Sequence, residues 1–148
     1  MRPLKFPRER GIAAIELALL LPLLVMMLAF PVYLGRVFWH YTVIEHAAQD
    51  AARYLSKVPV SEMANPARAA TVTAVVNQIV AAELAELAPG AHPYALAVAC
   101  DSGVCIGFNK PITIVVNIRV LMQDVLFPGS TDLTLPIEAY VTYPYLGR

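Results

Sequence analysis

The sequence predicts an α+β fold. A long N-terminal helix would begin in a membrane and continue as an amphipathic helix, and a second helix and a small antiparallel β-sheet would follow. Three observations predict it. An apolar run occupies residues 17–35. Apolar residues then recur every three or four positions up to about residue 57, which is the period of an α-helix. From Tyr94 onward, apolar residues alternate with polar or small ones, which is the period of a β-strand.

The apolar run is long enough to cross a lipid bilayer. Residues 17–35 contain no ionisable side chain except Tyr33, and about 20 residues at 1.5 Å each span a hydrocarbon core of roughly 30 Å. A signal peptide would have a shorter apolar core and a small-x-small cleavage site, which this run lacks. The aromatic cluster Tyr33, Phe38, Trp39 and Tyr41 suits the outer membrane–water interface, although a soluble core helix is the alternative. We therefore expect residues 12–36 to span a membrane.

Charge is distributed unevenly around this run. The chain has 148 residues and a formal net charge of zero, but residues 1–11 contain four basic residues and one acidic residue. Basic flanks favour the cytoplasmic side of a membrane, so residues 1–11 are predicted to be a cytoplasmic leader and the chain beyond Arg36 to be exported. The rest of the chain has seven basic and ten acidic residues, which argues against a nucleic-acid partner. The hydrophobic share of 58% and the mean hydropathy of +0.59 favour a membrane protein.

The first helix is predicted to extend over residues 12–57. Beyond the membrane run, one apolar stripe follows a 4-3-4-3-4 spacing and consists of Val37, Tyr41, Ile44, Ala48, Ala51 and Leu55. Such a stripe needs another element to pack against. Val58 precedes Pro59 and is biased away from helical geometry, so the helix should end there.

Residues 58–148 are predicted to form an exported α+β domain. Asn65 and Pro66 are favourable N-cap and first-turn residues for an Ala-rich helix over residues 67–87. Alternating segments then start near Tyr94, Ile112 and Leu133, separated by turn residues at 101–103, 109–111 and 128–130. Pro136 predicts an edge or a bulge in the last strand.

The only cysteines, Cys100 and Cys105, bracket a short turn. In an oxidising exported compartment such a pair can form a disulfide, and two unlinked strand cysteines are the alternative. The spacing is neither CxxC nor a four-ligand zinc pattern, so it supports neither redox catalysis nor metal binding.

No combination of residues predicts catalysis. His40, His46 and His92 lack a metal-binding or catalytic context, and the serines lack a nucleophile-elbow context. We therefore expect no enzyme activity, no cofactor, no metal and no small-molecule substrate.

The N-terminal region resembles a known family. A basic leader, Gly11, "IAAIE" with Glu16 five residues after the glycine, and the apolar run together resemble a prepilin processing site. The stretch from about Arg10 to Tyr54, with its Leu-Pro, its aromatic segment and "AAQDAARY", is similar to the TadE-like family of the bacterial tight-adherence (Flp) pilus system. The ending "PIEAYVTYPY" also fits this family. Leu17 stands where the family often has an aromatic residue and the chain is short for it, so the sister TadF-like family is an alternative.

The resemblance implies a pilin-like fold and a minor pilin or pseudopilin. A membrane prepilin peptidase would cut between Gly11 and Ile12, removing 11 of the 148 residues and leaving 137. In related pilins the retained glutamate neutralises the amino terminus of a neighbouring subunit, so Glu16 would meet the amine of Ile12 in an adjacent copy. Two charges in a low-dielectric helix bundle are tolerable when they are paired and costly when they are not. The alternative is that Glu16 lies at headgroup depth on a permanent anchor.

The implied function is pilus assembly, adhesion and biofilm formation. The implied partners are the inner membrane, the prepilin peptidase, other pilins or pseudopilins and tight-adherence assembly proteins. We expect a single-pass protein of the bacterial inner membrane with a cytoplasmic N-terminus and a periplasmic C-terminus, reaching the cell surface if it enters the pilus. The alternative function is a membrane-anchored periplasmic binding domain outside any pilus, for which no cleavage is expected and the Glu16 carboxylate is dispensable.

Overall fold

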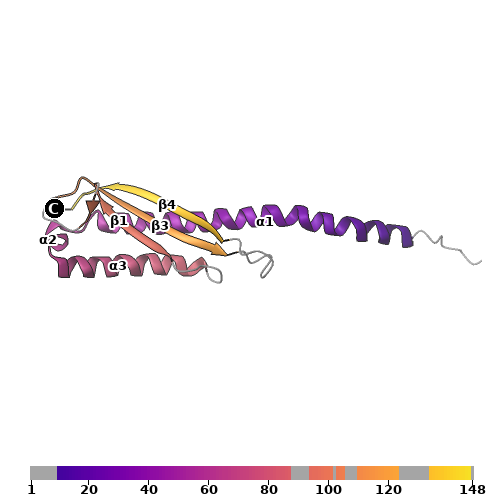
Figure 1. Ribbon diagram of the computed structural model, residues 1–148, viewed down its shortest axis with the longest axis horizontal. Coiled ribbons are helices and arrows are strands. Elements are labelled where there is room, and N and C mark those ends of the chain that lie inside the picture. The colour runs from indigo at the N-terminus through magenta and orange to yellow at the C-terminus, as the bar shows by residue number, and fades with distance from the viewer. Residues whose placement is uncertain (1–9, 88–93, 102, 106–109, 124–133, 148) are drawn as a thin grey trace, which may run out of the picture. The chain divides into compact units, whose positions relative to one another are not determined.

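The computed structural model describes residues 10–87, 94–101, 103–105, 110–123 and 134–147. Contacts divide the chain into two compact units, Met1–Arg36 and Val37–Arg148. A long helix, a second long helix and an antiparallel sheet follow one another along the chain (Figure 1). The α+β prediction is therefore confirmed.

Helix α1 (Arg10–Leu55) has 46 residues and continues through Pro22 and Pro31. Its bounds lie two residues before the predicted ones at each end. The last turn tightens because the N–H groups of Lys57 and Val58 bond to carbonyls three residues back, those of Tyr54 and Leu55. This tightening precedes Pro59, which cannot donate a backbone hydrogen bond and disfavours helical geometry in the residue before it.

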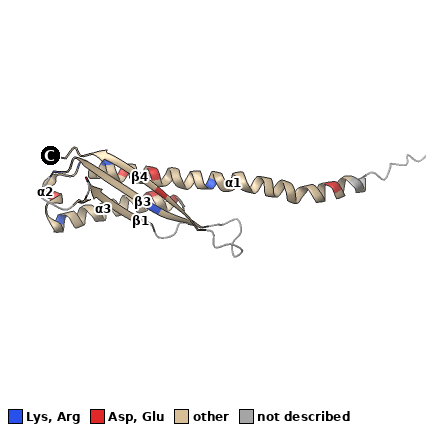
Figure 2. Cartoon of the chain, turned by 45° about the horizontal axis from the view of Figure 1, so that its top comes forward, with Lys and Arg blue, Asp and Glu red and all other residues tan. Residues whose placement is uncertain are grey.

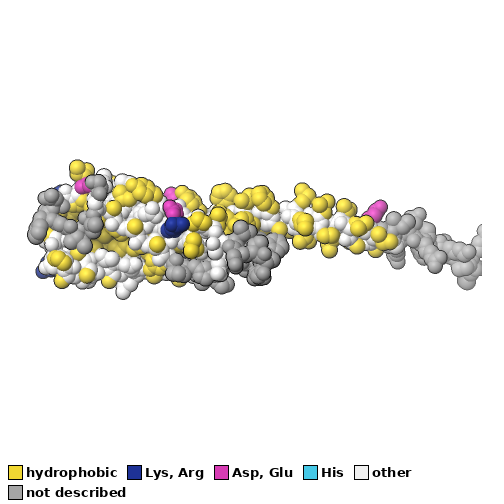
Figure 3. All heavy atoms as spheres, in the orientation of Figure 1, with side chains coloured by type: hydrophobic (Ala, Val, Ile, Leu, Met, Phe, Trp, Pro, Cys, Tyr) yellow, Lys and Arg dark blue, Asp and Glu magenta, His cyan; other side chains and the backbone are white. Residues whose placement is uncertain are grey.

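In the first unit, the side chains of α1 make almost no packing contacts. The large apolar side chains from Ile15 to Phe30 are each more than half exposed, and no residue of the most apolar stretch is buried. Hydrophobic side chains cover this part of the helix in Figure 3, and Figure 2 shows very few charged residues along it. By length and composition, α1 is able to cross a membrane. The residues Pro66–Leu87 pass the same test, but they are partly buried inside the second unit.

In the second unit, one face of α1 belongs to a hydrophobic core. Ile44, Ala48, Ala51 and Leu55 of the predicted stripe are buried. Tyr41, which was expected both on this stripe and in the interfacial aromatic cluster, is 45% exposed and does not belong to the buried face, and Val37 is only half-buried. The buried face begins later and is wider than predicted, because the small residues Ala47 and Ala52 are also fully buried.

Two helices follow α1. The short α2 (Val60–Met63) was not predicted; it begins after Pro59, whose extended backbone precedes the turn, and it buries Met63. Helix α3 (Pro66–Leu84) begins as predicted, with the Asn65 side-chain oxygen accepting a hydrogen bond from the Ala67 N–H at 3.0 Å. The 3-10 turn η1 (Ala85–Leu87) completes it.

The sheet has the strand order β2-β1-β3-β4, and all its pairings are antiparallel. Its strands are β1 (Ala95–Cys100), β2 (Gly103–Val104), β3 (Thr113–Gln123) and β4 (Thr134–Pro144). Val116 lies opposite both Val98 and Val141, so apolar residues of the three long strands share one face. Because α1 and α3 bury apolar residues in the same unit, this face and the two helices form a two-layer core.

The strand predictions are largely confirmed. Alternating residues of β3 from Ile114 to Met122 are buried, and β4, which contains Pro136, is an edge strand of the described sheet. Ile112 was expected to start the buried alternation, but it precedes β3 and is 78% exposed. The backbone hydrogen bonds of Ile112 explain the difference. Its N–H donates to the Asp101 carboxylate, and its carbonyl accepts from the Tyr145 N–H, so Ile112 belongs to a loop that precedes β3. Leu133 lies outside the described residues.

The C-terminal residues fasten the sheet to the end of α1. The Leu146 N–H donates to the Ser56 carbonyl at 2.8 Å, and the buried Tyr145 hydroxyl donates to the Val58 carbonyl. These carbonyls follow the last helical turn, where intrahelical donors are missing. Burial also raises the pKa of Tyr145 above its ordinary value, so its hydroxyl remains a donor. The buried Gly147 leaves room for this contact, because a Cβ there would overlap the Tyr145 hydroxyl and the Val58 carbonyl.

Gly147→Ala should therefore destabilise the second unit, by roughly 1–3 kcal/mol, because the added methyl overpacks a closed contact. Thermal unfolding of the purified chain in detergent measures the effect. The matched control is Gly103→Ala, where an added Cβ meets nothing within 4 Å. Equal unfolding temperatures for the two variants would contradict this role for the C-terminal segment.

Candidate functional site

The predicted cleavage position lies in the first turn of α1. Gly11 is exposed, and a Cβ added to it would meet no atom within 4 Å. The first N–H groups of a helix lack intrahelical acceptors, so this turn unwinds more easily than the helix interior. Gly11 is therefore exposed at the start of the helix.

Glu16 lies about one turn beyond Ile12 on the same helix. Its side chain is exposed, and within the described part of the chain it makes no ion pair or hydrogen bond. Its neighbours Ile15 and Leu17 are exposed apolar residues. A carboxylate costs roughly 2.5–3.5 kcal/mol at the centre of a bilayer and less near its edge, and Glu16 is close to the start of the predicted span. Nothing described within the chain offsets this cost.

An aromatic group occupies α1 where the second unit begins. Phe38 and Trp39 are 66% and 55% exposed, and His40 is the first buried residue of the helix among those whose side chains are described. The rings of Phe and Trp bury large apolar areas, and Trp also has a polar edge that favours the border between lipid and water. Both rings are therefore exposed and can contact the surroundings of the domain.

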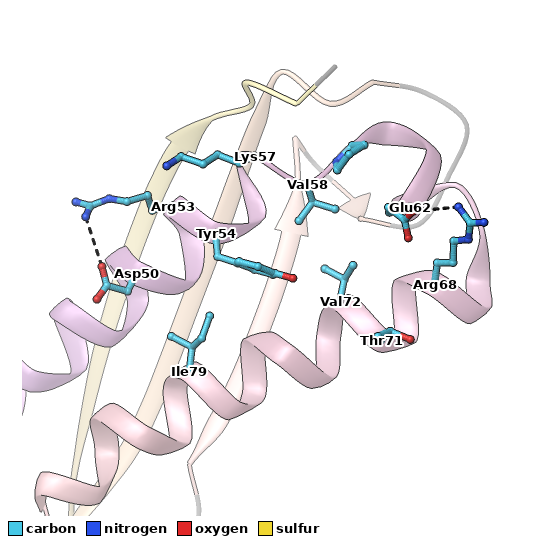
Figure 4. A pocket seen from close by; sticks show the side chains of 11 residues that line it. Asp50, Arg53, Tyr54, Lys57, Val58, Glu62, Arg68, Thr71, Val72 and Ile79 are labelled. Carbon is cyan, nitrogen blue, oxygen red and sulfur yellow. Dashed lines mark hydrogen bonds and ion pairs between the residues drawn. The ribbon is translucent and has the colours of Figure 1, made fainter.

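A groove of about 820 Å³ lies between the second half of α1 and α3. Tyr54 points from α1 towards α3, where Val72 and Ile79 complete the apolar surface (Figure 4). The other lining residues are Asp50, Arg53, Lys57, Val58, Pro59, Glu62, Arg68 and Thr71. The groove is thus an apolar channel with a charged rim.

Basic side chains predominate on this rim. Arg68 pairs with Glu62 at 2.9 Å, and Arg53 approaches Asp50 at 3.7 Å, which leaves Lys57 as the surplus charge (Figure 4). A hydrogen bond with Tyr143, together with the nearby Asp50 carboxylate, raises the pKa of Arg53, so its guanidinium stays protonated. Both ion pairs are exposed and therefore contribute little to stability.

Residues 11–53 match a protein-family model described as TadE-like protein. This segment is TadE-like. The match covers less than a third of the chain and ends within α1, and it confirms the resemblance predicted for the N-terminal region. Comparisons with curated proteins and with solved structures give no match. The TadE-like segment indicates a pilin-like protein associated with the tight-adherence pilus, and its long apolar helix is compatible with a membrane anchor.

Beyond the TadE-like segment, a disulfide closes the turn between β1 and β2. The sulfurs of Cys100 and Cys105 lie 2.16 Å apart. Cys100 is buried at the end of β1, opposite Gly103 and Ile114 on its two sides. The bond therefore joins the hairpin end to the core rather than forming a reactive surface.

Asp101 stabilises the same end of the sheet. Its carboxylate accepts hydrogen bonds from the backbone N–H groups of Ile112 and Thr113 and from the Thr113 hydroxyl. The backbone bond from Thr113 has the largest effect and lowers the pKa of Asp101. Asp101 has a φ of 52°, a conformation that Asp tolerates better than most residues.

Within the described residues, no group of three or more His, Cys, Asp or Glu side chains is arranged to hold a metal ion. Among the histidines, His40 is buried and His46 is exposed, whereas His92 lies outside the described residues. The candidate functional features are separate: the N-terminal turn and the apolar helix belong to the first unit, and the groove belongs to the second.

Sequence reasoning missed the groove and the role of Asp101. The two walls of the groove are separated by a turn and α2, so helical periodicity within one segment does not reveal it. Asp101 accepts hydrogen bonds from Ile112 and Thr113, which lie 11 and 12 positions further along the chain. Only the folded sheet brings these residues together, so the sequence alone does not reveal the interaction. An Asp at a turn was the available signal.

Stability should fall at low pH through Asp101. Its folded-state pKa lies below the ordinary value of about 3.9, so its stabilising contribution is present above about pH 4 and is lost as the pH falls through the folded-state pKa. Asp101→Asn should reduce this pH dependence, because the amide does not titrate in that range. Unfolding temperatures measured from about pH 6 to pH 2 test it; identical slopes for the native chain and the variant would contradict the assignment.

Proposed function

We propose that the chain is a minor pilin or pseudopilin of a tight-adherence pilus, held in the bacterial inner membrane and processed by a prepilin peptidase. It acts in pilus assembly, and through the pilus in adhesion and biofilm formation. The observation that carries the proposal is the exposed apolar part of α1, with an accessible Gly11 at its start and Glu16 one turn further on. The match of residues 11–53 to the TadE-like model supports it.

In this mechanism, cleavage after Gly11 creates an amino group at Ile12. The unpaired Glu16 carboxylate of a neighbouring copy neutralises that amino group when the apolar helices pack together. Pairing offsets the free energy of placing either charge in a low-dielectric bundle. The Glu16 carboxylate is therefore more stable in an assembly of helices, where it is paired, than on an isolated helix in lipid.

The basic leader predicts the orientation. Four of the first eleven residues are basic, which favours a cytoplasmic leader and a periplasmic second unit. A periplasmic location also supplies the oxidising compartment in which the bond between Cys100 and Cys105 persists.

Cleavage is tested by determining the N-terminus of the chain in cells that contain the prepilin peptidase. The expected chain begins at Ile12. Gly11→Trp should leave the precursor uncut, and Gly11→Ala, whose added Cβ would meet no atom within 4 Å, is the matched small substitution. A native chain that still begins at Met1 in these cells would contradict the processing step and favour a permanently anchored binding domain.

Glu16→Gln should retain membrane insertion but reduce incorporation into filaments. Removing one partner of a buried ion pair costs roughly 3–5 kcal/mol, because the other charge is left without compensation. The amount of the chain in sheared filaments, relative to the membrane fraction, measures this loss. Glu45→Gln on the second half of α1 is the matched control; if both variants assemble like the native chain, Glu16 has no role in assembly.

A further inference from the structure

The groove of the second unit combines an apolar floor with a charged rim. It combines the apolar surface of Tyr54, Val72 and Ile79 with a rim on which Arg53, Lys57 and Arg68 outnumber two acidic side chains. Arg53 and Arg68 are 56% and 57% exposed despite their ion pairs, so both remain reachable from outside. A narrow acidic element with small side chains would complement this surface.

The opposite end of α3 has that composition. Ala81 and Ala82 of α3 are exposed there, as are Ala85 and Glu86 of the following turn η1, and Glu83 is half-buried. The last turn of α3 contains no basic residue. Acidic residues at a helix C-terminus oppose the helix dipole, and cations stabilise it. This end of α3 would therefore gain from a basic partner.

One copy does not satisfy this need by itself. The groove includes Arg68, in the first turn of α3, whereas Glu86 lies 18 residues further along the same helical segment. At 1.5 Å per residue, these positions are about 27 Å apart. The basic groove and the acidic end therefore lie at opposite ends of α3, and the contact requires two molecules.

We propose that the second units of successive copies associate head to tail, with the acidic end of α3 (Glu83–Glu86) of one copy seated against the basic groove of the next. The surfaces differ, so the contact is heterologous, and it forms an open filament when the rotation between copies does not close a ring. It keeps all copies in one direction, which suits proteins that enter a filament from the same membrane. The inference rests on the proposed function and adds a subunit contact outside the apolar helix.

Cysteine crosslinking tests the contact in the full chain. In cells with the tight-adherence machinery, the double variant Lys57→Cys, Glu86→Cys should form a ladder of disulfide-linked multimers under oxidising conditions. The native cysteines do not interfere, since they are bonded to each other in the structure. The matched control, Lys57→Cys with Gln78→Cys, places the second thiol in the middle of the exposed face of α3 and should remain monomeric. A ladder from the control alone, or from neither variant, would overturn the proposal.

Charge exchange gives an independent test. Glu83→Lys with Glu86→Lys, and separately Lys57→Glu with Arg68→Glu, should each reduce the chain found in filaments by at least about tenfold, because like charges then face each other. When one cell produces both variants, opposite charges meet again at every junction, and incorporation should recover. Losses without recovery would contradict the contact, and so would unchanged incorporation of either variant.

These outcomes are separable from the proposed function itself. If cleavage after Gly11 and the need for Glu16 hold while charge exchange has no effect, only the head-to-tail contact fails. If the native chain is neither cleaved nor found in filaments, the proposed function fails. The disulfide and protease resistance of each variant show that its second unit is folded.

Discussion

The first half of α1 has an apolar surface, and no described part of the protein covers it. The proposed membrane anchoring and assembly of the chain both follow from this constraint. Side chains from Ile15 to Phe30 are mostly exposed. Burying apolar area is worth about 25 cal/mol per Å², so a helix of this kind is stable only in lipid or against other apolar helices. Glu16 is the exception within the run, and in the proposed mechanism it makes the helix favour a neighbour with a free amino group over lipid alone.

The second unit solves a different packing problem. The same helix has a face of small residues, Ala47, Ala48, Ala51 and Ala52, that is fully buried in this unit. The C-terminal segment then bonds to the carbonyls beyond the last helical turn through Tyr145 and Leu146. The end of the chain thereby fixes the sheet to the helix that carries the TadE-like segment. The second unit is therefore a stable support for surface features such as the groove.

Local signals in the sequence predicted those elements whose chemistry is local. The Asn65 cap, the end of α1 before Pro59 and the alternation of β3 each depend on neighbouring residues, and all three are present. Tyr41 was wrongly expected on the buried stripe, because periodicity identifies the face of a helix but not the point where the core begins. The short α2, the groove and the Asp101 bonds were not predicted, since each depends on segments brought together by the fold. The resemblance of the N-terminal segment could be recognised from sequence because its residues are close together along the chain, whereas cleavage after Gly11 and the role of Glu16 stay predictions.

The most direct test of the central claim is the N-terminal residue of the chains in purified, sheared filaments, determined by mass spectrometry of the terminal peptide. The account predicts that chains in the filament begin at Ile12, with the new amino group available to the Glu16 of a neighbour. Filaments that contain chains beginning at Met1, or filaments of normal yield that lack this protein altogether, would contradict it.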